Sequence, residues 1–314
     1  MLTTDTYGVY PIAPTPFLTN GDIDFNSISR LVSFYKEVGA KGVTILGVLG
    51  EASKMNAEEA VLVINAYAKN CNGLDLIVGV NSPGFASMKY LADSAMRAGA
   101  CAVLLGAPSN LRTDDQIIGY YNTAASVLGP ETPFIIQDYP LVLQVVFSNH
   151  VIKEIINTNQ NCAGLKHEDW PGLEKIRTLH RWMDEGSVRR VPIVTGNSGL
   201  FLDFECDNGV NGAMTGYAFP EMLVEAVGLS RIGKKDEMHD LYDAHLPYLR
   251  YEAQPKIGVG IRKYVLKRRG IFTSDTQRAP FIPLSDASMS EIDYLLDRLT
   301  KKLGITSIMR SYDV

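Results

Sequence analysis

Short apolar segments alternate with amphipathic segments along most of the chain, and this alternation restricts the fold more than any other sequence feature. We predict strands at 8–13, 42–47, 74–80, 102–105, 133–138, 163–166, 191–195 and 211–214. The intervening segments have helical periodicity; in 26–35, apolar positions 28, 31, 32 and 35 fall on one face. Strands that are apolar on both faces and separated by helices indicate a parallel sheet covered by helices.

Eight strand–helix units over roughly 230 residues match the size of a closed (β/α)8 TIM barrel, an α/β fold. A doubly wound open sheet is the alternative. We predict that residues 1–230 form the barrel and carry the active site. Beyond about residue 231 the strand pattern ends, and 234–250, 255–269 and 288–303 are predicted helices. Residues 231–314 are therefore expected to form a C-terminal helical appendage packed on the barrel.

Composition excludes several classes of protein. The 314 residues are 46% hydrophobic and 21% charged, with a net charge of -5 and no long basic run, so nucleic acid is not an expected partner. No run of about 18 apolar residues indicates a membrane span, and residues 1–6 lack the features of a signal peptide. The 4 cysteines and 5 histidines have no metal-ligand spacing. We expect a cytoplasmic protein with no metal and no cofactor.

The chemistry of a β/α barrel is placed where its strands end. The sixth predicted strand ends at Lys166, and strand alternation puts Glu168 on the same side. Two interpretations are open. Lys166 and Glu168 form a structural ion pair, or the apolar barrel mouth favours a neutral, nucleophilic lysine that forms imines with carbonyl compounds. By the same alternation, His167 and Asp138 point away from this side.

Other strand ends supply further candidates. The second strand runs into Gly47-Val48-Leu49-Gly50, whose backbone N–H groups are a plausible cradle for a carboxylate, although such a turn is often structural only. The fifth ends at Gln137-Asp138-Tyr139-Pro140, the seventh at Gly196 and the eighth at Met214.

These residues, together with Thr15-Pro16-Phe17, Glu51, Gly164-Leu165-Lys166 and Gly209-x-x-Gly212 ending in Pro220, resemble a known pattern. Over nearly its whole length the chain resembles the dihydrodipicolinate synthase / N-acetylneuraminate lyase family of class I aldolases. The resemblance implies a Schiff base between Lys166 and the keto group of pyruvate or another 2-oxo acid. It also implies carboxylate binding at residues 47–50 and a homo-oligomer, a dimer or tetramer.

The chain departs from the family pattern around this lysine. Val48 and Leu49 stand where hydroxylated residues are usual, and Gln137 stands at the position of the family's catalytic tyrosine. An amide cannot shuttle protons, so Tyr139 and Glu168 are the candidates for that role, with Thr44 and Thr195 as lesser ones. The residues that define the two name-giving activities fall at Val142, Ser109, Ser198 and Gly199, none of which matches.

We therefore expect a divergent lyase with Lys166, Tyr139 and Glu168 as catalytic residues. The predicted substrate-binding residues are Gly47, Val48, Leu49, Gly50, Gln137, Gly196 and Met214. The substrate is expected to be a 2-oxo acid, and aldol cleavage, aldol addition and dehydration remain open as outcomes. The alternative is a catalytically silent homologue that binds a 2-oxo acid and keeps Lys166 only as a cation.

Overall fold

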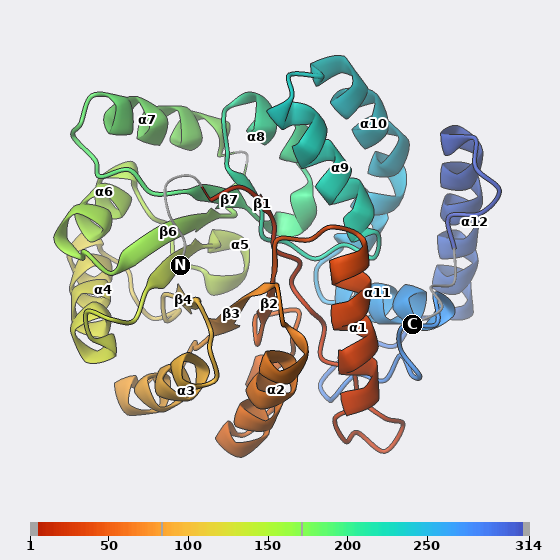
Figure 1. Cartoon of the computed structure of the whole chain (residues 1–314), viewed down its shortest axis with the longest axis horizontal. Coiled ribbons are helices and arrows are strands. Elements are labelled where there is room, and N and C mark those ends of the chain that lie inside the picture. Colours follow the sequence, from red (N-terminus) through yellow and green to blue (C-terminus); the bar gives the residue numbers. More distant parts are fainter. Residues whose placement is uncertain (1–5, 83, 171, 310–314) are drawn as a thin grey trace.

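The computed structural model describes residues 6–82, 84–170 and 172–309, and within these ranges the chain forms a barrel of eight parallel strands (Figure 1). The strands are β1 (Gly8–Val9), β2 (Gly42–Ile45), β3 (Asp75–Gly79), β4 (Ala102–Gly106), β5 (Phe134–Asp138), β6 (Cys162–His167), β7 (Ile193–Thr195) and β8 (Gly212–Ala213). From β2 to β8 the strands pair in parallel in the order of the sequence, and β8 pairs in parallel with β1.

Backbone hydrogen bonds between the segments around β1 and β2 close the barrel. Lys41 N–H donates to Val9 O at 2.9 Å, and Ala13 N–H donates to Thr44 O at 2.9 Å. The predicted TIM barrel is therefore confirmed, and the open doubly wound sheet is excluded.

Helices alternate with the strands and surround the barrel. They are α1 (Phe25–Glu37), α2 (Ala57–Asn70), α3 (Phe85–Arg97), α4 (Asp114–Leu128), α5 (Pro140–Leu143), α6 (Asn149–Thr158), α7 (Leu173–Asp184), α8 (Leu202–Asp207) and α9 (Pro220–Arg231). Local sequence sets several starts: Asn56 with Glu59, and Thr113 with Gln116, form capping boxes at α2 and α4.

The strands are apolar on both faces because each face is buried in its own apolar cluster. Side chains that point into the barrel form a small cluster that includes Tyr10, Ile77, Leu104 and Ile135. The alternate positions join a much larger core between the strands and the surrounding helices. Polar residues that face inward are consequently restricted to the barrel ends, where Gln137 and Lys166 lie.

Some predicted helices have different bounds in the structure. The helix expected from Pro171 is α7, which begins at Leu173; Pro171 itself lies outside the described residues. The helix expected at 199–208 is divided into a 3-10 turn, η2 (Asn197–Gly199), and α8. Positive φ at Ser198 (60°) and Gly199 (74°) breaks that helix. The short α5 after β5 was not predicted.

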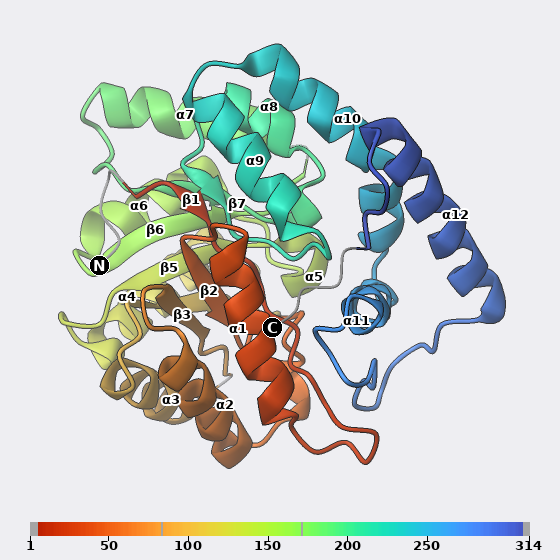
Figure 2. The ribbon, with the colours of Figure 1, turned by 45° about the vertical axis from the view of Figure 1, so that its right-hand side comes forward.

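The C-terminal segment consists of α10 (Lys235–Glu252), α11 (Gly258–Arg268) and α12 (Asp286–Leu303). In Figure 2, α10 runs beside α9, and α12 lies on the outside of α10, a packing that the contacts between these helices support. The division at residue 230 stays a prediction. No helix in the described ranges is long and apolar enough to span a membrane. The prediction about a signal peptide concerns residues 1–6, of which 1–5 lie outside the described part.

Candidate active site

Lys166 lies at the C-terminal end of β6, with its side chain inside the barrel mouth. In the strand register, Lys166 lies opposite Gln137 on β5 and Val194 on β7, so these three side chains face the same side of the sheet. Only 4% of Lys166 is exposed. The amine is thus buried at the end of the barrel where β/α enzymes place their chemistry.

Glu168 follows β6 by one residue and lies against Lys166, as strand alternation predicts. Its Oε2 atom is 3.0 Å from Lys166 Nζ and accepts a 2.7 Å hydrogen bond from Gln137 Nε2. Its Oε1 atom accepts a 2.9 Å bond from the backbone N–H of Asn197. Three donors from β5, β6 and the segment after β7 therefore fix one buried carboxylate next to the amine.

Gly196 provides the space that this carboxylate occupies. A Cβ atom at residue 196 would lie 2.3 Å from Glu168 Oε1 and 2.4 Å from its Cγ, far inside van der Waals contact. Gly196 thus affects the site only by leaving space for Glu168, because it does not itself line the cavity.

His167 and Asp138 lie on the other face of the sheet, as predicted, and both are fully buried. Asp138 Oδ2 is 2.8 Å from Lys175 Nζ and 3.6 Å from His167 Nδ1. Lys175 also pairs with Asp169 at 2.6 Å. This cluster attaches α7 to the ends of β5 and β6 behind Lys166.

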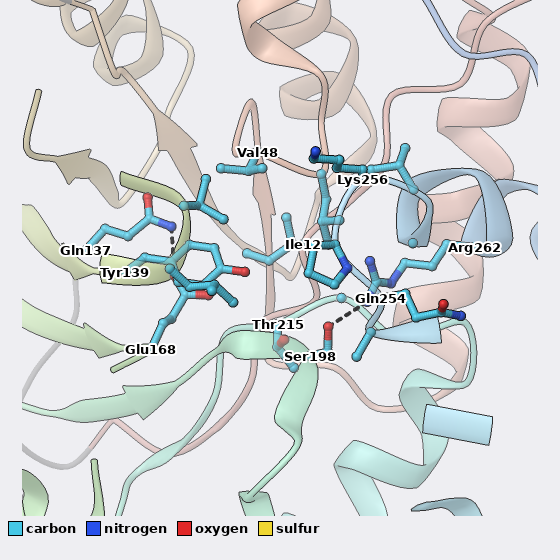
Figure 3. A pocket seen from close by; sticks show the side chains of 18 of the residues that line it. Ile12, Val48, Gln137, Tyr139, Glu168, Ser198, Thr215, Gln254, Lys256 and Arg262 are labelled. Atoms are coloured by element: carbon cyan, nitrogen blue, oxygen red, sulfur yellow. Dashed lines mark hydrogen bonds between the residues drawn. The ribbon is translucent and has the colours of Figure 1, made fainter. Parts of the chain in front are cut away.

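Lys166 and Glu168 line a cavity of about 350 Å³, which Figure 3 shows from close by. Its wall comprises Ile12, Val48, Leu49, Gln137, Tyr139, Leu141, Val142, Lys166, Glu168, Ser198, Thr215, Gly216 and seven residues between Ala253 and Arg262. Six predicted site residues thus share one cavity: Lys166, Glu168, Tyr139, Gln137, Val48 and Leu49. Four do not line it: Gly47, Gly50, Gly196 and Met214, of which Met214 packs in the barrel interior.

The turn at residues 47–50 borders the cavity, and hydrogen bonds and ion pairs hold it in position. The N–H groups of Gly50 and Glu51 donate to Gly47 O and Val48 O within the turn. Those of Val48 and Leu49 have no backbone acceptor in the part of the chain that the structure describes. Glu51, in a left-handed conformation (φ 54°), forms ion pairs with buried Lys263 and with Lys54. The C-terminal segment therefore holds this turn in place.

Tyr139 reaches into the cavity from the end of β5 (Figure 3). Burial raises the pKa of its phenol well above the usual value, and the negative charge of Glu168 adds to this, while Arg262 opposes it. The neutral phenol is therefore favoured over the phenolate, and it can act as a hydrogen-bond donor in the cavity. Thr44 and Thr195, the lesser candidates, are fully buried and do not line the cavity.

Sequence reasoning missed Arg262, which lines the cavity from α11. Its Nε atom is 2.6 Å from Glu252 Oε1, and its Nη2 donates to Ser198 Oγ at 2.7 Å. Ser198 had been noted only as a departure from the family pattern. No local signal points to Arg262, because its place depends on how the C-terminal helices fold back over the barrel. Among the described residues, no group of three or more His, Cys, Asp or Glu side chains could hold a metal ion.

Comparisons with known proteins agree with this architecture. The model of the dihydrodipicolinate synthetase family matches residues 5–299. A crystal structure of a dihydrodipicolinate synthase from Rhodopseudomonas palustris is 51% identical, covers 95% of this chain and 99% of that one, and superposes with a TM-score of 0.93.

Two curated relatives carry different activities in their names. The L-2-keto-3-deoxyarabonate dehydratase of Azospirillum brasilense is 25% identical over 93% of this chain and 94% of its own length. The N-acetylneuraminate lyase 2 of Escherichia coli is 26% identical, also over 93% of this chain and 94% of its own length. The family match covers nearly all of the chain, and the relatives are lyases and dehydratases. The chain therefore belongs to the dihydrodipicolinate synthetase family and is a lyase.

Proposed function

We propose that the protein is a Schiff-base-forming lyase that acts on pyruvate or a related 2-oxo acid, with Lys166 as the nucleophile. The observation that carries the proposal is the placement of Lys166. It is a nearly fully buried amine at the end of a barrel strand, it lines a cavity, and a carboxylate oxygen lies 3.0 Å from its nitrogen. Relatives named as a dehydratase and as a lyase support the reaction class.

Glu168 supplies the proton transfers that imine formation requires. Its carboxylate takes a proton from the Lys166 ammonium, and the free amine attacks the carbonyl carbon of the 2-oxo acid. The carbinolamine that forms then loses its hydroxyl as water after protonation, which leaves the imine. One carboxylate in contact with the amine can accept the first proton and return the second.

The imine withdraws electrons from carbon 3 of the acid, so a base can remove a proton there or a carbon–carbon bond can break there. Glu168 is the base in our proposal because it is the carboxylate in the cavity wall. Tyr139 is the proton donor in our proposal because its phenol lines the same cavity as Lys166 and Glu168. The buried Oε1 of Gln137 has no hydrogen-bond partner in the described protein and is available to a substrate hydroxyl.

The carboxylate of the 2-oxo acid fits the turn at residues 47–50. Val48 and Leu49 have no side-chain hydroxyl, so their two backbone N–H groups are the donors in this proposal.

Borohydride reduction in the presence of pyruvate tests the proposal. We expect a mass increase equal to pyruvate minus water plus two hydrogens, located on Lys166 by peptide mapping and absent from Lys166→Met. If no 2-oxo acid labels Lys166, the catalytic proposal is wrong. The silent homologue would in that case remain: thermal stabilisation by a 2-oxo acid, without adduct or turnover, would support it.

We further expect a cytoplasmic homo-oligomer, as the family resemblance implies. Light scattering coupled to size-exclusion chromatography measures the molar mass directly; the mass of a single 34.5 kDa chain would contradict this expectation.

A further inference from the structure

The cavity has two chemically different ends (Figure 3). Glu168 and Gln137 lie at one end, with Lys166 in contact with Glu168, and Arg262 and Lys256 of the C-terminal segment lie at the other. Pyruvate has six non-hydrogen atoms, which fill at most about 180 Å³ even if each took the share of a liquid water molecule. A cavity of about 350 Å³ therefore holds more than the acid that reacts with Lys166.

Arg262 is held in one position before any ligand arrives. Its residue is 3% exposed, and Glu252 and Ser198 engage Nε and one N–H of Nη2. Glu252 is itself fully buried and accepts hydrogen bonds of 3.2 and 3.1 Å from the N–H of Ala218. A guanidinium fixed in this way loses little rotamer entropy when it binds an anion.

Part of this guanidinium remains available. Arg262 carries five N–H donors, and Nη1 donates to no acceptor in the described part of the chain. The side chain of Arg262 belongs to the cavity wall, so a ligand in the cavity can reach the guanidinium. Two parallel N–H groups of a guanidinium match the two oxygens of a carboxylate.

The charges of the wall also favour a second anion. Among the described lining residues, Lys166, Lys256 and Arg262 are cationic and Glu168 is the carboxylate. Glu168 compensates Lys166, and Glu252 behind the wall compensates Arg262, whereas Lys256 has no ion pair among the described residues. The Arg262 end is thus left with one uncompensated positive charge.

The wall between the two ends is mainly apolar: Ile12, Val48, Leu49, Leu141, Val142 and Val259. These side chains cannot satisfy the hydroxyls of a sugar chain, and a hydroxyl that is buried without a partner lowers affinity. A short, weakly hydroxylated carbon chain fits this section.

We propose that Arg262 binds a second carboxylate of the substrate, so that the enzyme cleaves, forms or dehydrates 2-oxo dicarboxylic acids. This inference rests on the proposed imine at Lys166, which engages the keto end of the same molecule. Arg262 acts as a specificity residue and takes no part in the bond changes.

Matched pairs of 2-oxo acids test the inference through borohydride trapping on the full-length protein. The pairs are 2-oxoglutarate with 2-oxopentanoate, and 2-oxoadipate with 2-oxohexanoate; within each pair the molecules differ in the terminal carboxylate. We expect the diacid to reach half-maximal labelling of Lys166 at a concentration at least about tenfold lower than its partner.

Arg262→Lys should reduce this preference, and the double variant Arg262→Gln/Glu252→Gln, which leaves no unpaired buried charge, should abolish it. Pyruvate labelling of each variant is measured in parallel, so that a general loss of imine formation is separated from a loss that is confined to the diacid. Arg268→Gln, which removes an exposed arginine from the same helix, serves as the control and should keep the preference. Thermal unfolding of each variant verifies that it is folded, and Arg262→Lys keeps the test valid if the double variant is not.

Each failure has a distinct signature. Equal labelling by diacid and monoacid in the wild-type protein, or a preference that survives both Arg262 variants, overturns the role of Arg262 and leaves the imine proposal intact. A preference for a phosphonate-terminated 2-oxo acid over the diacid overturns the assignment to a carboxylate. Absence of any label on Lys166 removes the imine proposal and this inference together.

Discussion

Replacing Glu168 with glutamine tests the electrostatic design of the site. The exchange preserves shape but not hydrogen-bond polarity. Oε2 accepts from Gln137 and contacts Lys166, and Oε1 accepts from the Asn197 N–H, so all neighbours of the carboxylate are donors. Whichever terminal atom becomes the amide nitrogen must then face another donor.

The expected loss of stability follows from burial. The side chains of Lys166 and Glu168 are 5% and 4% exposed. Removing one partner of a buried pair costs about 3–5 kcal/mol, because the other charge is left uncompensated. In a chain longer than 250 residues, each kcal/mol of lost stability lowers the melting temperature by about 2 °C. The expected decrease for this variant is therefore roughly 6–10 °C.

Thermal unfolding of a double-mutant cycle measures whether this reasoning holds. Lys166→Met alone should also destabilise, since it leaves Glu168 unpaired, but the double variant Lys166→Met/Glu168→Gln should cost much less than the sum of the two. If the two costs add to within about 0.5 kcal/mol, the two side chains are not coupled and the ion pair does not exist in solution.

Three further predictions concern single positions. Gly196→Ala should slow pyruvate trapping by roughly 10²-fold or more, because the added Cβ displaces Glu168; an unchanged trapping rate would contradict the role given to that carboxylate. Tyr139→Phe should still form the imine but slow deuterium exchange into the methyl group of pyruvate, followed by NMR, by about 10²-fold; equal exchange rates would remove the phenol from the mechanism. Burial raises the pKa of Glu205 from 4.5 to about 8. Between these two pH values the folded state binds more protons than the unfolded state, so the free energy of unfolding falls by up to roughly 1.4 kcal/mol per pH unit as the pH rises. Glu205→Gln should reduce this dependence of the unfolding free energy on pH, measured by denaturant titration. If the variant and the wild-type protein show the same dependence, the Glu205 carboxyl is not buried in the folded state.

The barrel and its main site residues follow from local patterns in the sequence. Period-two alternation in 163–169 predicts that Lys166 and Glu168 share one side and that His167 faces the other. The structure places them so, because the chain continues in strand-like alternation one residue beyond β6. Such positions can be predicted because a strand end fixes the direction of each side chain without reference to distant residues.

Contacts between distant segments could not be predicted in this way. Arg262 and Ser198 are 64 residues apart in sequence, and their hydrogen bond exists only because α11 folds back to the barrel mouth. Similarly, the need for glycine at residue 196 becomes visible only when Glu168 is seen to fill the space beside it. The unpredicted break before α8 has a local cause, but left-handed φ at a serine is too uncommon to be expected from sequence.

The departure from the family pattern at Gln137 makes chemical sense together with Glu168. A buried carboxylate beside Lys166 requires hydrogen-bond donors, and the Gln137 amide, on the neighbouring strand, provides one at 2.7 Å. An amide donates this hydrogen bond without giving up its proton, so Gln137 orients the Glu168 side chain but cannot exchange protons itself. Proton transfer therefore passes to the carboxylate that the amide orients. A site of this kind needs no ionisable group at residue 137, and we expect Gln137→Glu to harm it, because two carboxylates would then share one buried position and repel each other.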